Sequence, residues 1–284
     1  MTVEPWGRVE PRRSAERCGS TEPRSSAAGA HADAGPRFLE VQGLHAGYGP
    51  MEVLHGVDMV VRPGQIVGIL GPNGMGKTTL LRAIAGLIPP SGGEIRFKGR
   101  LINRLPVDER VRLGVTLVPE GRILFAGLTV EENLLLGAYR LRRPRRLEHL
   151  NLVYDVFPQL PGRRRQLAGT LSGGQQQMLA IGRGLMARPE LLLIDEFSLG
   201  LAPVVVESIL EALARLHGMS PISMVIVEQD VAVGLHLASW GYVLESGRVV
   251  LEDAAGSLLE DARVRETYLG LAVGTADARG SEVR

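Results

Sequence analysis

The chain has 284 residues, of which 45% are apolar and 22% charged, and its formal net charge is +1. This balance is typical of globular proteins and gives no overall attraction to nucleic acid or anionic lipid. The single cysteine, Cys18, excludes an internal disulfide, and no apolar run approaches the ~20 residues of a membrane-spanning helix. We therefore expect a soluble cytosolic protein that contacts a membrane only through a partner.

Residues 1–36 differ in composition from the rest of the chain. They are rich in Ala, Ser, Pro, Gly, Arg and Glu and contain few large apolar side chains. Such a segment buries too little surface to offset its ordering entropy. We expect a disordered N-terminal extension, or a translation start assigned too far upstream. The folded domain is expected over 37–272, followed by a disordered tail at 273–284.

The first predicted elements are short β-type runs between Phe38 and Val61, which alternate with Gly and Pro and indicate an antiparallel sheet. The run Gln65–Leu70 is apolar on both faces, which is typical of a buried strand, and a helical pattern follows it. Strands are expected at Gly93–Phe97 and Val115–Glu120, and helical periodicity dominates from about 129 to 188. The remaining elements are a strand at Leu191–Asp195, a helix near Val204–Leu216, a strand at Ser223–Val227, a helix near Val231–Ala238 and a hairpin at Gly241–Glu252.

This element order predicts an α/β fold with a parallel core, an antiparallel β element before it and an all-helical insertion between about 125 and 187. In open α/β sheets, ligands bind beyond the carboxyl ends of the strands. The apolar run that begins at Met224 ends in Glu228, Gln229 and Asp230. A functional site is therefore expected at this edge of the sheet.

The segment Gly71–Thr78, GPNGMGKT, matches the phosphate-loop pattern G-x-x-x-x-G-K-[ST] and lies between a buried strand and a helix. Glycines let backbone N–H groups curl around phosphates, and the helix N-terminus adds a favourable dipole. Lys77 is expected to contact the β- and γ-phosphates, and the Thr78 hydroxyl to bind Mg²⁺. The expected nucleotide-binding residues of this loop are Gly71, Pro72, Asn73, Gly74, Met75, Gly76, Lys77, Thr78 and Thr79.

A second motif ends the strand LLLID, where Asp195 and Glu196 follow an apolar run. Asp195 is expected to hold Mg²⁺, directly or through water. Glu196 is expected to orient or deprotonate an attacking water. Taken alone, the two carboxylates could simply end a strand in solvent, but the phosphate loop favours a functional interpretation.

A third motif, LSGGQQQ at Leu171–Gln177, places a serine and two glycines before a helix. It predicts a second anion-binding helix N-terminus. One phosphate loop already accommodates one nucleotide, so this motif is expected to bind phosphates on another molecule. Its expected binding residues are Ser172, Gly173, Gly174 and Gln175. The apolar residues that follow at helical spacing are expected in the core: Met178, Leu179, Ile181, Leu185 and Met186.

The three motifs, in this order and spacing, resemble the ATP-binding subunit of an ABC transporter over about Phe38 to Leu271. The resemblance implies a P-loop NTPase core of the ABC type with an antiparallel β subdomain and a helical subdomain. It also implies ATP and Mg²⁺ as cofactors and a head-to-tail pair of subunits. ATP would lie between the phosphate loop of one subunit and the LSGGQ motif of the other, and the helical subdomain would dock onto a membrane partner.

Further positions acquire roles from this resemblance. Tyr48 matches the aromatic residue that stacks on adenine, although it would otherwise be an ordinary sheet tyrosine. Glu120 stands where the family favours Gln and can still ligate Mg²⁺ or water. Gln229 stands where the broader family has His; its NH₂ group can hold the γ-phosphate but cannot shuttle a proton. The expected catalytic residues are Glu196, Gln229 and Lys77, and the expected Mg²⁺ ligands are Thr78, Glu120 and Asp195.

Glu120 and Gln229, with the segments LTVEENLLLGA and SLGLAP, resemble in particular the shorter ATP-binding subunit of branched-chain amino-acid importers. Two positions depart from the broader family. Leu201 stands where many members have Asp, and Phe197 replaces the usual Pro, which is expected to loosen the turn behind Glu196.

The resemblance implies an ATP-hydrolysing subunit at the cytoplasmic face of the cell membrane. Its partners would be a second ABC ATPase subunit, in this branch a longer sister subunit, and two membrane-spanning permease subunits. An extracytoplasmic binding protein would deliver branched-chain amino acids. The alternatives are import of urea or short amides, a low-turnover regulatory nucleotide-binding subunit, and a soluble ABC protein acting on ribosomes or DNA. The Arg-rich run Tyr139–His149 is interpreted as a solvated surface, so no nucleic-acid partner is expected.

Overall fold

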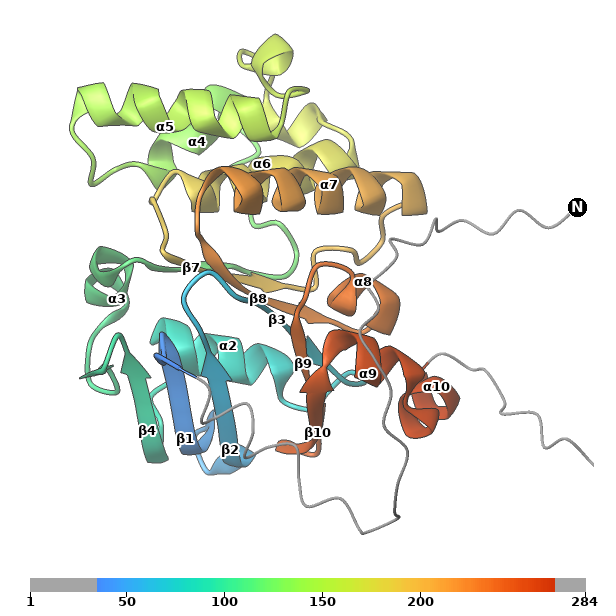
Figure 1. The fold of residues 1–284 in the computed structure, drawn as a ribbon. Helices are drawn as coiled ribbons and strands as arrows, with labels where there is room; N and C mark the ends of the chain where they lie inside the picture. The colour runs from blue at the N-terminus through green and yellow to red at the C-terminus, as the bar shows by residue number, and fades with distance from the viewer. Residues whose placement is uncertain (1–34, 269–284) are drawn as a thin grey trace, which may run out of the picture.

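The computed structural model describes residues 35–268, which form two β-sheets and the helices that cover them (Figure 1). The expected disordered tail at 273–284, and all but two residues of the expected extension at 1–36, lie outside the described residues. The strands are β1 (Leu39–Tyr48), β2 (Met51–Val61), β3 (Ile66–Leu70), β4 (Gly92–Phe97), β5 (Arg100–Leu101), β6 (Val115–Val118), β7 (Leu191–Asp195), β8 (Ser223–Glu228), β9 (Trp240–Glu245) and β10 (Arg248–Ala254). The helices are α2 (Lys77–Ala85), α3 (Val107–Leu113), α4 (Val130–Gly137), α5 (Arg143–Val156), α6 (Gly173–Leu185), α7 (Pro203–Met219), α8 (Val231–Leu235), α9 (Ala255–Glu260) and α10 (Ala262–Tyr268), with short 3-10 turns η1 (Pro161–Arg163) and η2 (Ala168–Thr170).

The antiparallel sheet has the strand order β2-β1-β4-β5. It confirms the β element predicted before the phosphate loop, and it also takes in β4, which follows that loop in the chain. The Tyr242 hydroxyl of β9 links the two sheets, because it accepts from Val60 N over 3.1 Å and lies 3.2 Å from Val60 O. The antiparallel sheet is therefore fixed against the core sheet.

The core sheet has the order β10-β9-β3-β8-β7-β6. Its strands are parallel except for β10, which pairs antiparallel with β9 and confirms the predicted hairpin. Every residue of β3, β7 and β8 is buried, because packed layers cover both faces. Alternate residues enter different cores. Leu193 and Val225 pack with α2 and the antiparallel sheet, whereas Leu192 and Met224 pack with α6 and α7.

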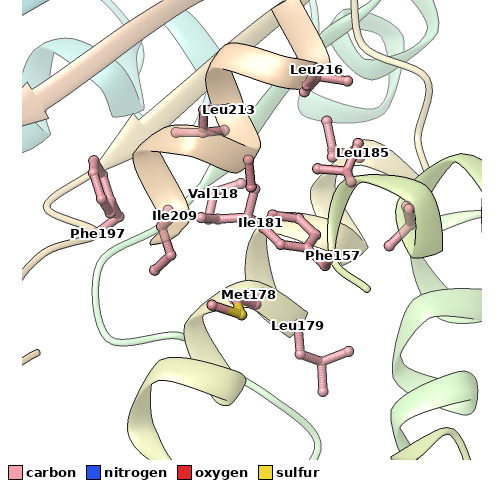
Figure 2. Packing of buried hydrophobic residues seen from close by; sticks show 14 of the residues in the cluster. Val118, Phe157, Met178, Leu179, Ile181, Leu185, Phe197, Ile209, Leu213 and Leu216 are labelled. Atoms are coloured by element: carbon pink, nitrogen blue, oxygen red, sulfur yellow. The ribbon is translucent and has the colours of Figure 1, made fainter. Parts of the chain in front are cut away.

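The predicted helical insertion is formed by α4, α5 and α6, which lie with α7 at the opposite end of the molecule from β1, β2 and β4 (Figure 1). A capping box between Thr129 and Glu132 begins α4. Side chains from β6, α6 and α7 meet in one apolar cluster (Figure 2). The residues after the LSGGQ motif are buried as predicted: Met178, Leu179, Ile181, Leu185 and Met186.

Phe197 also lies in this cluster and is fully buried (Figure 2). Its ring packs in the core beside the turn after β7. The loosening expected from the loss of Pro stays a prediction. Leu201 is partly buried and packs against the same cluster. Both departures from the family pattern are apolar side chains that join the core.

The helix expected at Val231–Ala238 is shorter than predicted, since α8 ends at Leu235. The chain leaves the helix there because Ser239 N donates to Ile66 O over 3.0 Å, which begins the pairing of β9 with β3. No helix within residues 35–268 combines the length and the apolar character needed to cross a bilayer.

Candidate functional site

The loop of residues 71–76 joins β3 to α2 and has a backbone suited to glycine. Gly71 has a φ of 148°, and a Cβ atom there would lie 2.3 Å from the carbonyl oxygen of Leu244. Gly76, the N-cap of α2, has a φ of 100° and no side-chain cap. Both positions therefore require glycine, and the first-turn N–H groups of α2 are presented toward the loop. This is the geometry of an anion-binding helix N-terminus.

Lys77 places a buried cation inside this loop. Its side chain is 3% exposed, and Nζ donates to the carbonyl oxygens of Gly71 over 2.7 Å and Pro72 over 3.0 Å. The same atom lies 3.2 Å from Oε1 of Glu196. The ammonium group is thus held at the loop by two backbone oxygens and one carboxylate. An anionic ligand can take the place of the carboxylate.

Glu196 follows β7 directly and has a φ of 42°, an uncommon value for a residue with a side chain. Its N–H donates to Val227 O over 2.9 Å, which holds the bent backbone against β8. Its carboxylate lies between Lys77 and Gln229, whose Nε2 is 2.5 Å from Oε2. Gln229 therefore faces Glu196, to which its amide donates without adding charge. Strained backbone of this kind is typical of functional sites.

Asp195 ends β7 and accepts a hydrogen bond from Thr78 Oγ1 over 3.1 Å. Burial raises the pKa of Asp195 to about 6; the Thr78 hydroxyl opposes this shift, and the carboxylates of Glu196 and Glu120 add to it. A divalent cation beside these oxygens would offset that penalty. Within residues 35–268, no three His, Cys, Asp or Glu side chains form a protein-only cation site. The Thr78 hydroxyl beside the Asp195 carboxylate offers oxygen ligands of the kind that Mg²⁺ takes. Mg²⁺ usually binds one or two carboxylates together with substrate phosphates and water.

A cavity of about 440 Å³ brings most of the predicted site residues together. Tyr48 stands at its side, 47% exposed, with its hydroxyl accepting from Arg82 Nη1 over 3.0 Å. The exposed ring presents a face on which a planar base can stack. The residues lining the cavity are Tyr48, Met51, Val53, Asn73, Gly74, Gly76, Lys77, Thr78, Thr79, Glu120, Glu196, Leu199 and Gln229.

Three predicted loop residues are not among those that line this cavity: Gly71, Pro72 and Met75. The carbonyl oxygens of Gly71 and Pro72 hold Lys77 instead. Met75 contacts the turn between β9 and β10, where its oxygen accepts from Gly247 N over 3.1 Å and its sulfur from Ser246 N over 3.2 Å. These residues shape the loop rather than line the pocket.

The LSGGQ motif also stands apart from the cavity. Ser172 is the exposed N-cap of α6 and forms a capping box with Gln175. Neither these two residues nor Gly173 and Gly174 are among those that line the pocket. The structure thus separates this second helix N-terminus from the phosphate loop of the same chain, which is the separation expected if it serves another molecule.

Sequence reasoning placed Glu228 at the expected edge of the sheet but gave it no role, and it missed its partner Ser198. Glu228 ends β8, is 2% exposed, and accepts hydrogen bonds from Ser198. The available signal was an acidic residue closing a wholly apolar run immediately before Gln229. Its partner, thirty positions earlier, has no sequence pattern that reveals it.

A family model described as ABC transporter matches residues 54–198, just over half of the chain. The chain belongs to the ABC transporter family. Its curated relatives include the high-affinity branched-chain amino acid transport ATP-binding protein BraG of Pseudomonas aeruginosa, 44% identical over 78% of this chain and 95% of that protein. The probable branched-chain amino acid transport ATP-binding protein LivF of Archaeoglobus fulgidus is 35% identical over 82% of this chain and 99% of that protein.

Solved structures of ABC ATPases have the same fold. A nucleotide-free ATP-binding cassette from an ABC transporter superposes with a TM-score of 0.73 at 26% identity, covering 82% of this chain and 98% of that one. The ADP conformation of the ATP-binding cassette MJ1267 gives 0.73 at 27% identity, covering 83% and 99%. The predicted P-loop ABC fold is confirmed, and the chain is a nucleotide-binding ABC-type ATPase.

Proposed function

We propose that this ATPase energises the import of branched-chain amino acids. The main observation in support of ATP hydrolysis is the position of the Glu196 carboxylate. It is held between Lys77 and Gln229 at the cavity that the phosphate loop lines. The cargo is proposed from the similarity to BraG and LivF, whose names give branched-chain amino acid transport.

Binding of ATP follows from the shape and charge of the site. The N-terminus of α2 and Lys77 take the phosphates, and Tyr48 stacks on the adenine. Thr78 and Glu120, which line the cavity, and Asp195, which is hydrogen-bonded to Thr78, would hold Mg²⁺. The ion would supply positive charge to offset that of the phosphate oxygens. Phosphate oxygens compete with Glu196 for Lys77, because a triphosphate carries more charge than one carboxylate.

Release of Lys77 leaves Glu196 free to act as a base. Glu196 then orients a water molecule and accepts its proton, while the water oxygen bonds to the γ-phosphorus. The bond from that phosphorus to the β–γ bridging oxygen breaks, giving ADP and phosphate. Gln229 donates from its amide, first to Glu196 and then to the γ-phosphate.

The assembly is proposed from what the chain leaves exposed. Ser172, Gly173, Gly174 and Gln175 complete the ATP site of a second ABC ATPase subunit, here a longer sister subunit. The helical subdomain, about 125–187, docks onto one of two membrane-spanning permease subunits that receive cargo from an extracytoplasmic binding protein. Its exposed apolar side chains support this role: Phe125, Leu136 and Tyr139. The subunit would then lie at the cytoplasmic face of the cell membrane.

Turnover of Mg-ATP tests the catalytic assignment. The purified chain, alone in a concentration series and mixed with the sister subunit, is compared with Glu196→Gln and Lys77→Ala. We expect Glu196→Gln to bind ATP but to lose about a hundredfold or more in kcat, as removal of a general base does. Lys77→Ala is expected to lose ATP binding itself. Equal turnover of wild type and Glu196→Gln would refute the role of Glu196.

Uptake of radiolabelled leucine, with urea beside it, tests the cargo in cells that lack and then regain the gene. Restored leucine uptake supports the proposal, and restored urea uptake alone refutes it. An assembly that binds ATP but shows the same slow turnover with or without Glu196 would identify the chain as the regulatory subunit.

A further inference from the structure

Glu228 is a buried carboxylate that the proposed mechanism does not use. It ends β8 with 2% of its surface exposed. Its Oε2 accepts from the Ser198 hydroxyl over 2.7 Å, and its Oε1 accepts from Ser198 N over 3.0 Å. Burial raises the pKa of Glu228 to about 7; the hydrogen bonds from Ser198 oppose this shift, and the negative charges of Glu196 and Asp230 add to it. Burying an ionisable carboxyl group lowers the free energy of unfolding unless its contacts compensate, so a role for these contacts is expected.

The contacts of Glu228 close a ring around the proposed catalytic pair. Along one side, the chain runs from Glu196 through Phe197 to Ser198. Along the other, Glu228 is bonded directly to Gln229. The two sides are joined at both ends, by Ser198 to Glu228 and by Gln229 to Glu196. The buried ring of Phe197 fixes the first side in the core.

This closed set of contacts adjoins an exposed turn at Leu199. Leu199, next to Ser198, lines the ATP cavity and is 54% exposed, whereas neither Ser198 nor Glu228 lines that cavity. Glu228 therefore acts on the site only through the backbone and through Ser198. Movement of Leu199 would be passed to Glu196 through Ser198 and Phe197.

We propose that Glu228 is a positioning residue for ATP hydrolysis, which sets the distance between Glu196 and Gln229 by binding Ser198. This inference rests on the roles proposed for Glu196 and Gln229. A glutamate suits the task because its two oxygens take both donors of one residue. A Gln side chain can do nearly the same, since its oxygen accepts from Ser198 N while its NH₂ donates to the hydroxyl oxygen. A Leu side chain has similar bulk but leaves the Ser198 N–H without that partner.

The test compares Glu228→Leu and Glu228→Gln with Val225→Ala, a buried change on the same strand that lies away from the ring. Mg-ATP turnover, ATP binding and Tm are measured on the full chain, with its sister subunit where turnover requires one. We expect Glu228→Leu to lower kcat about tenfold or more, as misplacement of a reacting group does, with little change in ATP affinity. Glu228→Gln should keep kcat within about threefold of wild type. Val225→Ala should lower Tm and leave kcat unchanged.

Three outcomes would overturn the proposal. One is an unchanged kcat in Glu228→Leu. Another is equal loss in Glu228→Leu and Glu228→Gln, which would make the charge, not the bridge, the active feature. The third arises if Glu228→Leu and Val225→Ala have the same Tm and lose kcat to the same extent. Glu228 would then have a structural role only. Failure of the proposed function is distinguishable, since it appears as normal turnover in Glu196→Gln.

Discussion

At the scale of single residues, the amide of Gln229 is a donor whose charge does not change with pH. It donates to Glu196 from the end of β8. An imidazole at this position can still donate, but it gains a proton near pH 6.5. Gln229→His is therefore expected to keep turnover near neutral pH and to acquire an added step in kcat between about pH 5.5 and 7.5. Rates measured from pH 5.5 to 8.5 check this, with Gln229→Leu as the inactive control. Loss of activity in Gln229→His at every pH would show that the amide geometry is required.

The carboxyl of Glu228 gives the free energy of unfolding a pH dependence. Burial raises its pKa from 4.5 to about 7, so the folded protein holds the proton more tightly than the unfolded chain. The resulting stability is fully present below about pH 4.5 and is lost as the pH rises through 7. Glu228→Gln removes that loss. We expect it to melt a few degrees above wild type at pH 8, with the difference shrinking toward pH 5.

Thermal melts at pH 5, 6, 7 and 8 measure this difference. Glu260→Gln, an exposed change on α9, provides the control and should melt with wild type throughout. A Glu228→Gln difference that stays constant across pH would mean that the carboxyl does not titrate in this range.

The sequence predicts a site residue when the residue belongs to a local motif, and fails to predict it when the residue is defined by a contact between distant segments. Lys77, Thr78, Asp195 and Glu196 lie in motifs whose spacing is set by phosphate and metal chemistry, and the structure gathers all four at one site. The role of Glu228 depends instead on its hydrogen bonds to Ser198, which lies in the turn after β7. A buried acid at the end of an apolar strand looks the same in sequence whether it meets solvent or a hydroxyl group, so only the fold reveals it.

At the scale of elements, Arg110 joins α3 to the end of α2. Its side chain is 1% exposed and donates only to carbonyl oxygens: Ala83 and Ile84 in α2, and Asn103 and Leu105 before α3. The guanidinium caps the last turn of the helix that begins with the phosphate loop. Burial lowers the pKa of Arg110 to about 10, so it remains charged near neutral pH.

Arg110→Met should lower the free energy of unfolding by about 2–4 kcal/mol, because several buried acceptors lose their donor at once. Chemical denaturation measures the change. Arg112→Met is the matched control, since that side chain on the same helix is exposed in an ion pair with Asp108; its effect should be below about 1 kcal/mol. Equal losses in the two variants would show that the buried hydrogen bonds contribute little.

At the scale of the whole molecule, the kinds of elements were predictable and their arrangement in space was not. Apolar runs marked β3, β7 and β8 because burial on both faces demands apolar side chains at every position. The placement of β4 in the antiparallel sheet and of β8 between β3 and β7 follows from pairing between distant strands. Local periodicity contains no information on such pairing. The motifs depend only on neighbouring residues, so they indicate candidate site residues without the sheet order.

The separation of Ser172 from the cavity predicts how two subunits meet. Ser172 is exposed at the N-terminus of α6 and is not part of its own chain's pocket. An arginine there would place a long side chain where a second subunit must approach. Ser172→Arg is therefore expected to leave ATP binding to the isolated chain unchanged, and to abolish ATP-dependent pairing and turnover. Fluorescent-ATP titration measures binding, and light scattering with Glu196→Gln in the background measures pairing. Ser257→Arg, exposed on α9, is the control and should pair normally. Weakened ATP binding in Ser172→Arg alone would instead place the LSGGQ motif at the nucleotide of its own chain.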